Sequence, residues 1–262
     1  MPTCKSAPPR TTIRRAFASS ATARVAAALA PALLAAGCGG GSPLFHGAHV
    51  LDAGAISQGA GFSATFASRM TRAAGPAQGA DQRALDGALA PSIAPWVGGR
   101  AGLGGDNEAG LAYTGRALRI DARHAFEDRS TAFSIGVGAS GILGGREDGR
   151  DVDGNERSAP AGFGFDVPLL AGWRSAAGVV TLLGGVRGGF ERVSANPSLP
   201  TEVALRRWYG GAVLGLGLGF RHVHGLIELD GYYNDVSGSV EGTDVHLTGV
   251  TITPGAALVF TF

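Results

Sequence analysis

The sequence predicts an all-β fold, a single closed antiparallel up-and-down transmembrane β-barrel of about 10 strands. Hydrophobic residues alternate with small or polar residues along most of the chain, as they do in strands with two different faces. The 44 glycines are too many for helices, and they fall within the alternating runs. Although 45% of the residues are hydrophobic, no apolar run is long enough for a transmembrane helix. Barrel strands have this low average hydropathy because lipid-facing and lumen-facing residues alternate.

The alternation outlines ten candidate strands, whose ends it defines to within ~2–4 residues. They are 55–67, 92–103, 109–114, 117–126, 131–143, 162–174, 179–193, 203–220, 225–236 and 246–262. If 109–114 and 117–126 formed one strand, the count would be odd and the topology would fail, so they are kept apart.

Short and long connections alternate between these strands. The short ones are 104–108, 127–130, 175–178 and 221–224, and the long ones are 68–91, 144–161, 194–202 and 237–245. The exception is Gly115-Arg116, a tight turn on the long side. Because membrane barrels have short periplasmic turns and long external loops, this pattern predicts that both chain ends lie on the periplasmic side.

The last ten residues, Thr253 to Phe262, carry a closing-strand pattern. A polar residue is followed two positions later by glycine and then by alternating hydrophobic residues that end in Phe262. This pattern resembles the closing strand of bacterial outer-membrane β-barrel proteins, without pointing to a particular subfamily. The resemblance implies a location in the bacterial outer membrane, contact with its lipid, and recognition of this strand by the barrel-assembly machinery. The residues of this assembly signal are Gly255, Leu258, Phe260 and Phe262.

The amino-terminal residues 1–37 predict a secretory signal peptide. They contain no acidic residue, and an apolar run from Val25 to Gly37 follows the basic residues. Leu34-Ala-Ala-Gly-Cys38 resembles a bacterial lipobox, which implies that Cys38 becomes the lipidated first residue of the mature chain. Ordinary cleavage nearby, with Cys38 incidental, is the alternative. The predicted organisation is a signal peptide over 1–37, a lipid-anchored flexible tether over 38–54 and a barrel domain over 55–262.

The charge of the mature chain argues against a nucleic-acid partner. Without the five basic residues of the signal, 17 basic and 21 acidic residues remain, a net charge of −4. Nucleic-acid binding needs clustered positive charge. The two cysteines, Cys4 and Cys38, leave no disulfide in the mature chain, because the first is removed and the second takes the lipid. The oligomeric state stays open.

The alternation also assigns the two faces of the wall. The outward rows are Phe163, Phe165, Val167, Leu169, Ala171 and Trp173; Val180, Leu182, Val186 and Phe190; Trp208, Leu214, Leu216, Leu218 and Phe220; and Val250, Ile252, Leu258, Phe260 and Phe262. Trp173, Trp208, Tyr233 and the terminal Phe lie near strand ends, where aromatic girdles occur in membrane barrels.

Eleven charged residues fall on the opposite, lumen-facing positions. They are Arg100, Arg119, Asp121, Arg123, Asp166, Arg174, Arg187, Glu191, Arg207, Glu228 and Asp230, accompanied by Tyr209, Tyr232 and Asn234. Ten strands enclose a narrow interior, and charges away from bulk water persist when they are paired and hydrogen-bonded. The favoured interpretation is a salt-bridged plug that holds the barrel shape. A thin polar conduit or a binding pocket is the alternative.

Other candidate chemistry is sparse. The stretch from Asp151 to Glu156 spaces oxygen ligands as calcium loops do, but its glycine is misplaced, and a solvated acidic loop is favoured. His222 and His224 could place two imidazoles on one side of a strand end, but no carboxylate or cysteine lies near them in the sequence, and a polar periplasmic turn is favoured. His124 and His246 are predicted at opposite ends of the barrel. We therefore assign no catalytic residue, no metal site and no cofactor, and we expect that the protein is not an enzyme.

Together these features predict an integral outer-membrane β-barrel, structural or surface-exposed, with a lumen plugged by charges. One alternative is a narrow channel or transporter for small solutes. A second alternative is a soluble β lipoprotein that faces the periplasm.

Overall fold

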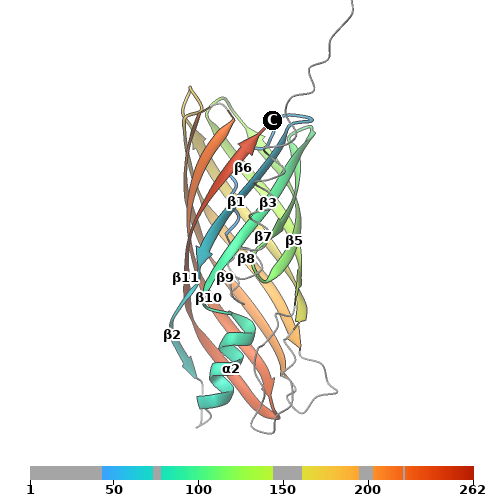
Figure 1. The fold of residues 1–262 in the computed structure, drawn as a ribbon, viewed down its shortest axis with the longest axis vertical. Coiled ribbons are helices and arrows are strands. Elements are labelled where there is room, and N and C mark those ends of the chain that lie inside the picture. The colour runs from blue at the N-terminus through green and yellow to red at the C-terminus, as the bar shows by residue number, and fades with distance from the viewer. Residues whose placement is uncertain (1–42, 73–77, 144–160, 195–202, 221) are drawn as a thin grey trace, which may run out of the picture. The chain divides into compact units, whose positions relative to one another are not determined.

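The computed structural model describes residues 43–72, 78–143, 161–194, 203–220 and 222–262 (Figure 1). The strands are β1 (Ile56–Ala64), β2 (Phe66–Arg72), β3 (Ile93–Gly104), β4 (Asn107–Tyr113), β5 (Ala117–Glu127), β6 (Thr131–Ile142), β7 (Ala161–Arg174), β8 (Val180–Ser194), β9 (Val203–Phe220), β10 (Val223–Val240) and β11 (Thr243–Thr261). Within the described ranges the one helix is α2 (Gln78–Ala88).

The strands form a single closed barrel, as predicted. Every pairing is antiparallel, each strand from β3 to β11 lies beside the next, and β1 pairs with both β3 and β11. Only Thr65 separates β1 from β2, and both pair with β11, so the two form one interrupted spanning strand and the barrel has ten. Closure gives each spanning strand a partner on both sides, which a two-sheet sandwich does not do.

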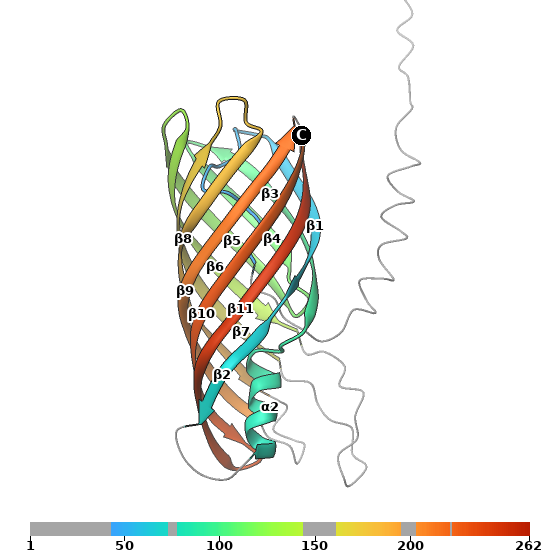
Figure 2. The ribbon, with the colours of Figure 1, turned by 90° about the vertical axis from the view of Figure 1, so that its left-hand side faces the viewer.

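The connections differ in length at the two ends of the barrel. Short turns join β3 to β4, β5 to β6, β7 to β8 and β9 to β10, and the carboxyl-terminus lies at this same end (Figure 2). The tight turn at Gly115-Arg116 separates β4 from β5, as predicted.

Two predicted long connections are structured, contrary to the prediction. Residues 68–91 contain the end of β2 and all of α2, and residues 237–245 form a hairpin that turns at Glu241-Gly242. Both turn residues have positive φ, 52° and 73°, which is the geometry of a two-residue hairpin turn. Residues 144–160 and 195–202, which cover most of the other two predicted loops, lie outside the described residues.

The outer face of the barrel is apolar over a continuous belt. Outward residues alternate with buried ones along each strand, and every predicted outward row faces away from the lumen. Large apolar side chains such as Trp208 (60% exposed) and Phe220 (68% exposed) would be poorly placed in water. In lipid they are well placed, because closure pairs the backbone polar groups within the sheet. No helix among the described residues is both long enough and apolar enough to cross a membrane.

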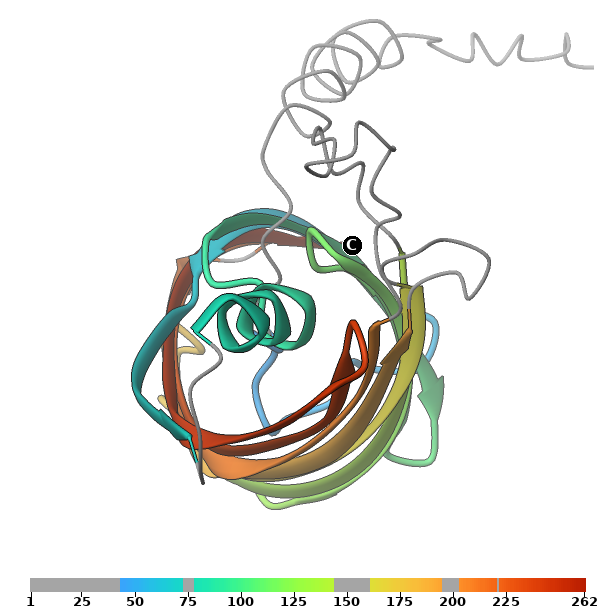
Figure 3. The same ribbon diagram turned by 90° about the horizontal axis from the view of Figure 1, so that it is seen from below.

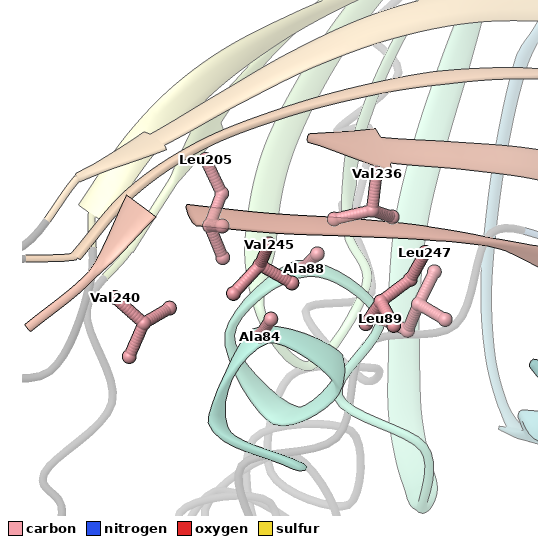
Figure 4. Packing of buried hydrophobic residues seen from close by; sticks show 8 residues of the cluster. All are labelled: Ala84, Ala88, Leu89, Leu205, Val236, Val240, Val245 and Leu247. Atoms are coloured by element: carbon pink, nitrogen blue, oxygen red, sulfur yellow. The ribbon is translucent and has the colours of Figure 1, made fainter. Parts of the chain in front are cut away.

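The wall is uneven in height. β4 has 7 residues, whereas β9, β10 and β11 have 18, 18 and 19. α2 contacts β9, β10 and β11 inside the barrel (Figure 3). Its apolar residues join the inner faces of these strands in a cluster shown in Figure 4: Ala84, Ala88, Leu89, Leu205, Val236, Val240, Val245 and Leu247. Helix α2 therefore packs inside the lumen against the tallest part of the wall.

Candidate functional site

The candidate site is the barrel lumen, whose charged side chains form networks across neighbouring strands. Asp166 on β7 lies between two arginines. Arg119 Nη2 and Nε donate to its carboxylate at 2.8 and 2.9 Å, and Arg187 Nε donates at 3.1 Å. Arg119 also pairs with Asp121. All of these side chains are buried, so each charge is balanced inside the wall rather than by water.

A second group continues this network toward the short-turn end. Arg100 on β3 pairs with both Asp121 and Glu108, and Arg123 Nη2 donates to Glu108 Oε1 at 2.9 Å. Asp121 thus contacts Arg100 and Arg119, which links the two groups into one chain of alternating charges. Such alternation leaves no isolated charge among these side chains.

Glu108 was not among the predicted lumen residues. The sequence placed it in the turn before the strand at 109–114, but β4 begins at Asn107 and Glu108 is 1% exposed. Glu108 lies two residues before Gly110, so both share one face if the strand is extended. This spacing was the sequence signal that could have identified Glu108 as a lumen residue. A strand that starts two residues earlier points this carboxylate into the lumen opposite Arg123.

A third group lies nearer α2. Arg207 on β9 donates to Glu191 at 3.1 Å and to Asn234 at 2.8 Å, and its guanidinium lies 4.6 Å from the ring centre of Tyr209. Arg116, which the sequence placed only in a tight turn, is half-buried here. Its Nη1 donates at 2.9 Å to the carbonyl oxygen of Ala88, so a cation caps the carboxyl end of α2.

The remaining predicted lumen residues lie apart from these groups. Glu228 and the fully buried Asp230 are neighbours on the inner face of β10. Arg174 is half-buried at the short-turn end of β7, and no ion pair of its side chain is seen among the described residues. The structure therefore places all eleven predicted residues on the inner wall or at its end, and brings eight of them into ion pairs with one another or with Glu108.

Residues 43–55, which we call the lumen segment, enter β1 from inside the barrel: 43–46 are buried, and 52–54 are exposed at the short-turn end. The backbone N–H of Phe45 donates to Glu228 Oε2 at 2.8 Å, and the N–H of Leu51 donates to Glu108 Oε2 at 2.8 Å. Arg123 Nη2 donates to the carbonyl of His49 at 2.8 Å. The sequence predicted a flexible tether over 38–54; the described part of it follows instead a path fixed by hydrogen bonds to wall side chains. The physical reason is that buried backbone groups need partners, and the lumen charges supply them.

Phe45 anchors the lumen segment by packing. Its ring meets Trp96 edge to face at 5.0 Å between ring centres, and Ala257 completes the cluster. A side chain at Gly255 would come within 2.6 Å of the Phe45 ring, so only glycine leaves room at that position. Gly255, predicted as part of an assembly signal, thus also forms the seat of Phe45.

His46 is the buried imidazole of the lumen segment. Burial, together with the guanidiniums of Arg100 and Arg123, lowers the pKa of His46 well below its usual value. The ring is therefore neutral at pH 7, and its Nδ1 lies 2.9 Å from Arg123 Nη1. A neutral ring can accept this hydrogen bond, whereas a charged one would repel the guanidinium.

The other predicted positions lie outside this network. Leu258, Phe260 and Phe262 face outward at the carboxyl end, and Cys38 lies outside the described residues. His124 on β5 contacts Asn107 at the short-turn end, whereas His246 pairs with Asp235 near the opposite end, so these imidazoles do not meet. The described residues contain no group of three side chains suited to hold a metal ion. The calcium-like stretch 151–156 lies outside the described residues.

Comparison with known proteins finds similarity at the level of solved structures. No protein-family model matches the sequence, and no curated protein matches it. The chain is similar to Neisserial surface protein A (11% identity, 79% of this chain and 96% of that chain, TM-score 0.34). It is similar to the attachment invasion locus protein of Yersinia pestis (12%, 79% and 99%, TM-score 0.26) and to the outer membrane protein OprG from Pseudomonas aeruginosa (9%, 83% and 99%, TM-score 0.33). These identities and TM-scores are low. The strand pairing and the apolar outer surface of this chain are themselves those of an outer-membrane β-barrel.

Proposed function

We propose that this outer-membrane β-barrel is a closed structural or surface-exposed protein, neither an enzyme nor a general porin. The single observation that carries the proposal is that the lumen is occupied along its length. The lumen segment lies in the half nearest the short turns, the ion-paired side chains lie in the middle, and α2 packs against β9, β10 and β11 toward the opposite end. A solute path would need these three obstacles to move together.

A small cavity in the lumen supports the same proposal. A cavity of about 40 Å³ lies between α2 and the third charge group, with Leu89, Arg116, Glu191 and Arg207 among its lining residues. This volume holds a few water molecules, which need about 10–15 Å³ each by this measure. Its polar lining suits water that bridges charged groups rather than a transported solute.

A narrow channel for small solutes is the second candidate. The observation that favours it is that only noncovalent contacts hold the described lumen segment against the wall, namely hydrogen bonds to Glu228, Glu108 and Arg123 and the packing of Phe45 on Trp96. A segment held in this way can leave the lumen without breaking a covalent bond, and the polar inner wall would then line a water-filled path.

Planar-bilayer recording of the purified protein tests the proposal. We expect the wild type to be almost silent and a variant that lacks residues 43–54 to conduct, because the deletion removes the filling of one half of the lumen. The control Glu241→Gln, which breaks an exposed ion pair with Arg83, should stay as silent as the wild type. Steady, large, charge-selective conductance in the wild type would overturn the closed-barrel proposal and support the channel.

A further inference from the structure

Two arginines face each other on the outer wall of the barrel. The strand register places Phe163, Arg192, Arg206, Ser237 and His246 in one row across β7 to β11. Arg192 and Arg206 are both exposed. Like charges directly opposite each other destabilise a sheet, so we expect an anionic partner to compensate the repulsion between these two arginines.

The arginine charges of this row have no ion-pair partner within the part of the chain that the structure describes. Among the described residues no ion pair involves Arg192 or Arg206, and the row itself holds no acidic side chain. The nearest outward carboxylate on β10, Asp235, lies two residues before Ser237, opposite Trp208 on the membrane side, and pairs with His246 at 3.1 Å. Arg206 Nε donates to Ser237 Oγ at 2.9 Å, which orients its guanidinium and leaves the remaining N–H groups available.

An aromatic patch lies directly beside the arginine pair on the membrane side. Phe190 lies 4.7 Å from Trp208 between ring centres and 6.5 Å from Phe163, which in turn lies 5.8 Å from Phe165. Twelve residues of β9 separate Trp208 from Phe220 at the short-turn end. At ~3.3 Å per residue and a tilt of ~40° this is a height of ~30 Å, the thickness of a bilayer core. Trp208 therefore lies at the far lipid–water boundary, and Arg206 lies one step beyond it, among the headgroups.

We infer that Arg192 and Arg206 bind a phosphate of a phosphorylated glycolipid in the outer leaflet, while the aromatic patch contacts its acyl chains. Two guanidiniums offer paired N–H donors to phosphate oxygens, the geometry that phosphate recognition uses. An anion between them would also relieve their mutual repulsion. The inference rests on the membrane orientation proposed above, with the short turns on the periplasmic side.

Native mass spectrometry of the purified mature protein with diphosphorylated lipid A tests the site. The double variant Arg192→Gln/Arg206→Gln should retain this lipid about tenfold more weakly, because charge-assisted hydrogen bonds are lost. The matched control Arg129→Gln removes an exposed arginine from the turn between β5 and β6 at the other end, and should behave as the wild type. Undiminished retention by the double variant would overturn the inference. Equal retention of phosphate-free lipid A or of phosphatidylglycerol by the wild type would also overturn it.

Orientation is tested separately from lipid binding. A cysteine introduced by Asp244→Cys, at an exposed position beside the β10–β11 turn, should react with a membrane-impermeant maleimide on intact cells. Absence of labelling would overturn the outer-leaflet assignment. A conducting wild type would overturn only the closed-barrel proposal, so the failures of the two ideas are distinguishable. Heat-modifiable migration on gels checks that each variant is folded.

Discussion

The carboxylate of Glu228 accepts a hydrogen bond from the backbone N–H of Phe45 at 2.8 Å, although 183 positions separate the two residues in the sequence. The same carboxylate accepts a second hydrogen bond from the N–H of Leu44. One buried wall side chain thus satisfies two backbone donors of the lumen segment. A single carboxylate of β10 therefore fixes the backbone of Leu44 and Phe45 inside the lumen.

Replacing that carboxylate should release the lumen segment. Glu228→Ala leaves two buried N–H groups without acceptors, at about 1–3 kcal/mol each. We expect a lower thermal midpoint in detergent and faster protease cleavage within residues 43–54. Glu241→Gln is the control, because it removes an exposed carboxylate whose pairing contributes about 0–1 kcal/mol. Protection of residues 43–54 in Glu228→Ala equal to that in the wild type would contradict the anchoring role.

Asp166 should be the most sensitive position of the charge network. Asp166→Asn leaves both Arg119 and Arg187 without their shared carboxylate, and breaking a buried pair in this way costs about 3–5 kcal/mol. Denaturant unfolding in detergent micelles, followed by tryptophan fluorescence, measures the change. Asp128→Asn, in the exposed turn before β6, should stay close to wild type. A small effect at Asp166 would indicate that water, rather than the protein, balances these arginines.

Two glycines of β6 face opposite sides of the barrel wall: Gly138 faces the lumen and Gly141 faces outward. A methyl group at Gly138 would come within 2.5 Å of Arg119 Nη2 and 2.7 Å of Asp166 Oδ2, whereas none of the neighbouring atoms lies within 4 Å of one at Gly141. We expect Gly138→Ala to destabilise the barrel by about 1–3 kcal/mol through overpacking, and Gly141→Ala to be neutral. Thermal unfolding of the two variants in the same detergent makes the comparison. Equal midpoints would mean that the Arg119–Asp166 pair has room to move.

The strands and their faces were predictable because the alternation of apolar with small or polar residues, which has a period of two, is visible in the sequence. The row from Phe163 to Trp173 could be assigned outward without a structure, and so could the buried positions of Asp166 and Arg187. The cross-strand partners of the charged residues were harder to predict. The pairing of Arg119 with Asp166 depends on a register that spans 47 positions, which alternation alone does not specify.

Helix α2 and the lumen segment could not be predicted for a different reason. The buried face of α2 consists mainly of alanines, Ala84 and Ala88, so its amphipathic signal is weak and the tall inner wall of β9–β11 stabilises it. The lumen segment has no regular secondary structure, and its path depends on wall groups that lie far away in the sequence. Tertiary contacts determine the conformation of both segments, and the local sequence pattern contains little information about those contacts.

The terminal Phe262 should matter for assembly and little for stability. Its side chain is 68% exposed at the end of β11 and buries little surface in the folded barrel. Phe262→Ala keeps the backbone hydrogen bonds that this residue exchanges with Ile56. The variant should lower the amount of protein inserted into outer membranes of growing cells, whereas refolding in detergent and the thermal midpoint should be unchanged. A loss of both membrane insertion and thermal stability would identify Phe262 as a packing residue rather than a recognition signal.

Lipidation of Cys38 remains a prediction with a direct readout. Metabolic labelling with a fatty-acid analogue should mark the wild type and leave Cys38→Ser unlabelled. Because the barrel itself is embedded in lipid, both forms should resist carbonate washing, since one lipid anchor adds little to an integral protein. An unlabelled wild type whose amino-terminus maps downstream of Cys38 would exclude the modification.

The position of the lumen segment immediately before β1 has a consequence for the order of folding. β1 is the first strand of the barrel, and its pairing with β11, the last one, closes the wall. The contacts of the segment reach forward to β4, β5 and β10, and the one with β10 joins residues 183 positions apart, so the complete set can form only when most of the chain is present. Such long-range contacts are slow to form. Closure and filling are therefore a single late event, and a barrel that sealed with the segment outside would have to reopen its β1–β11 seam or thread the chain through one end.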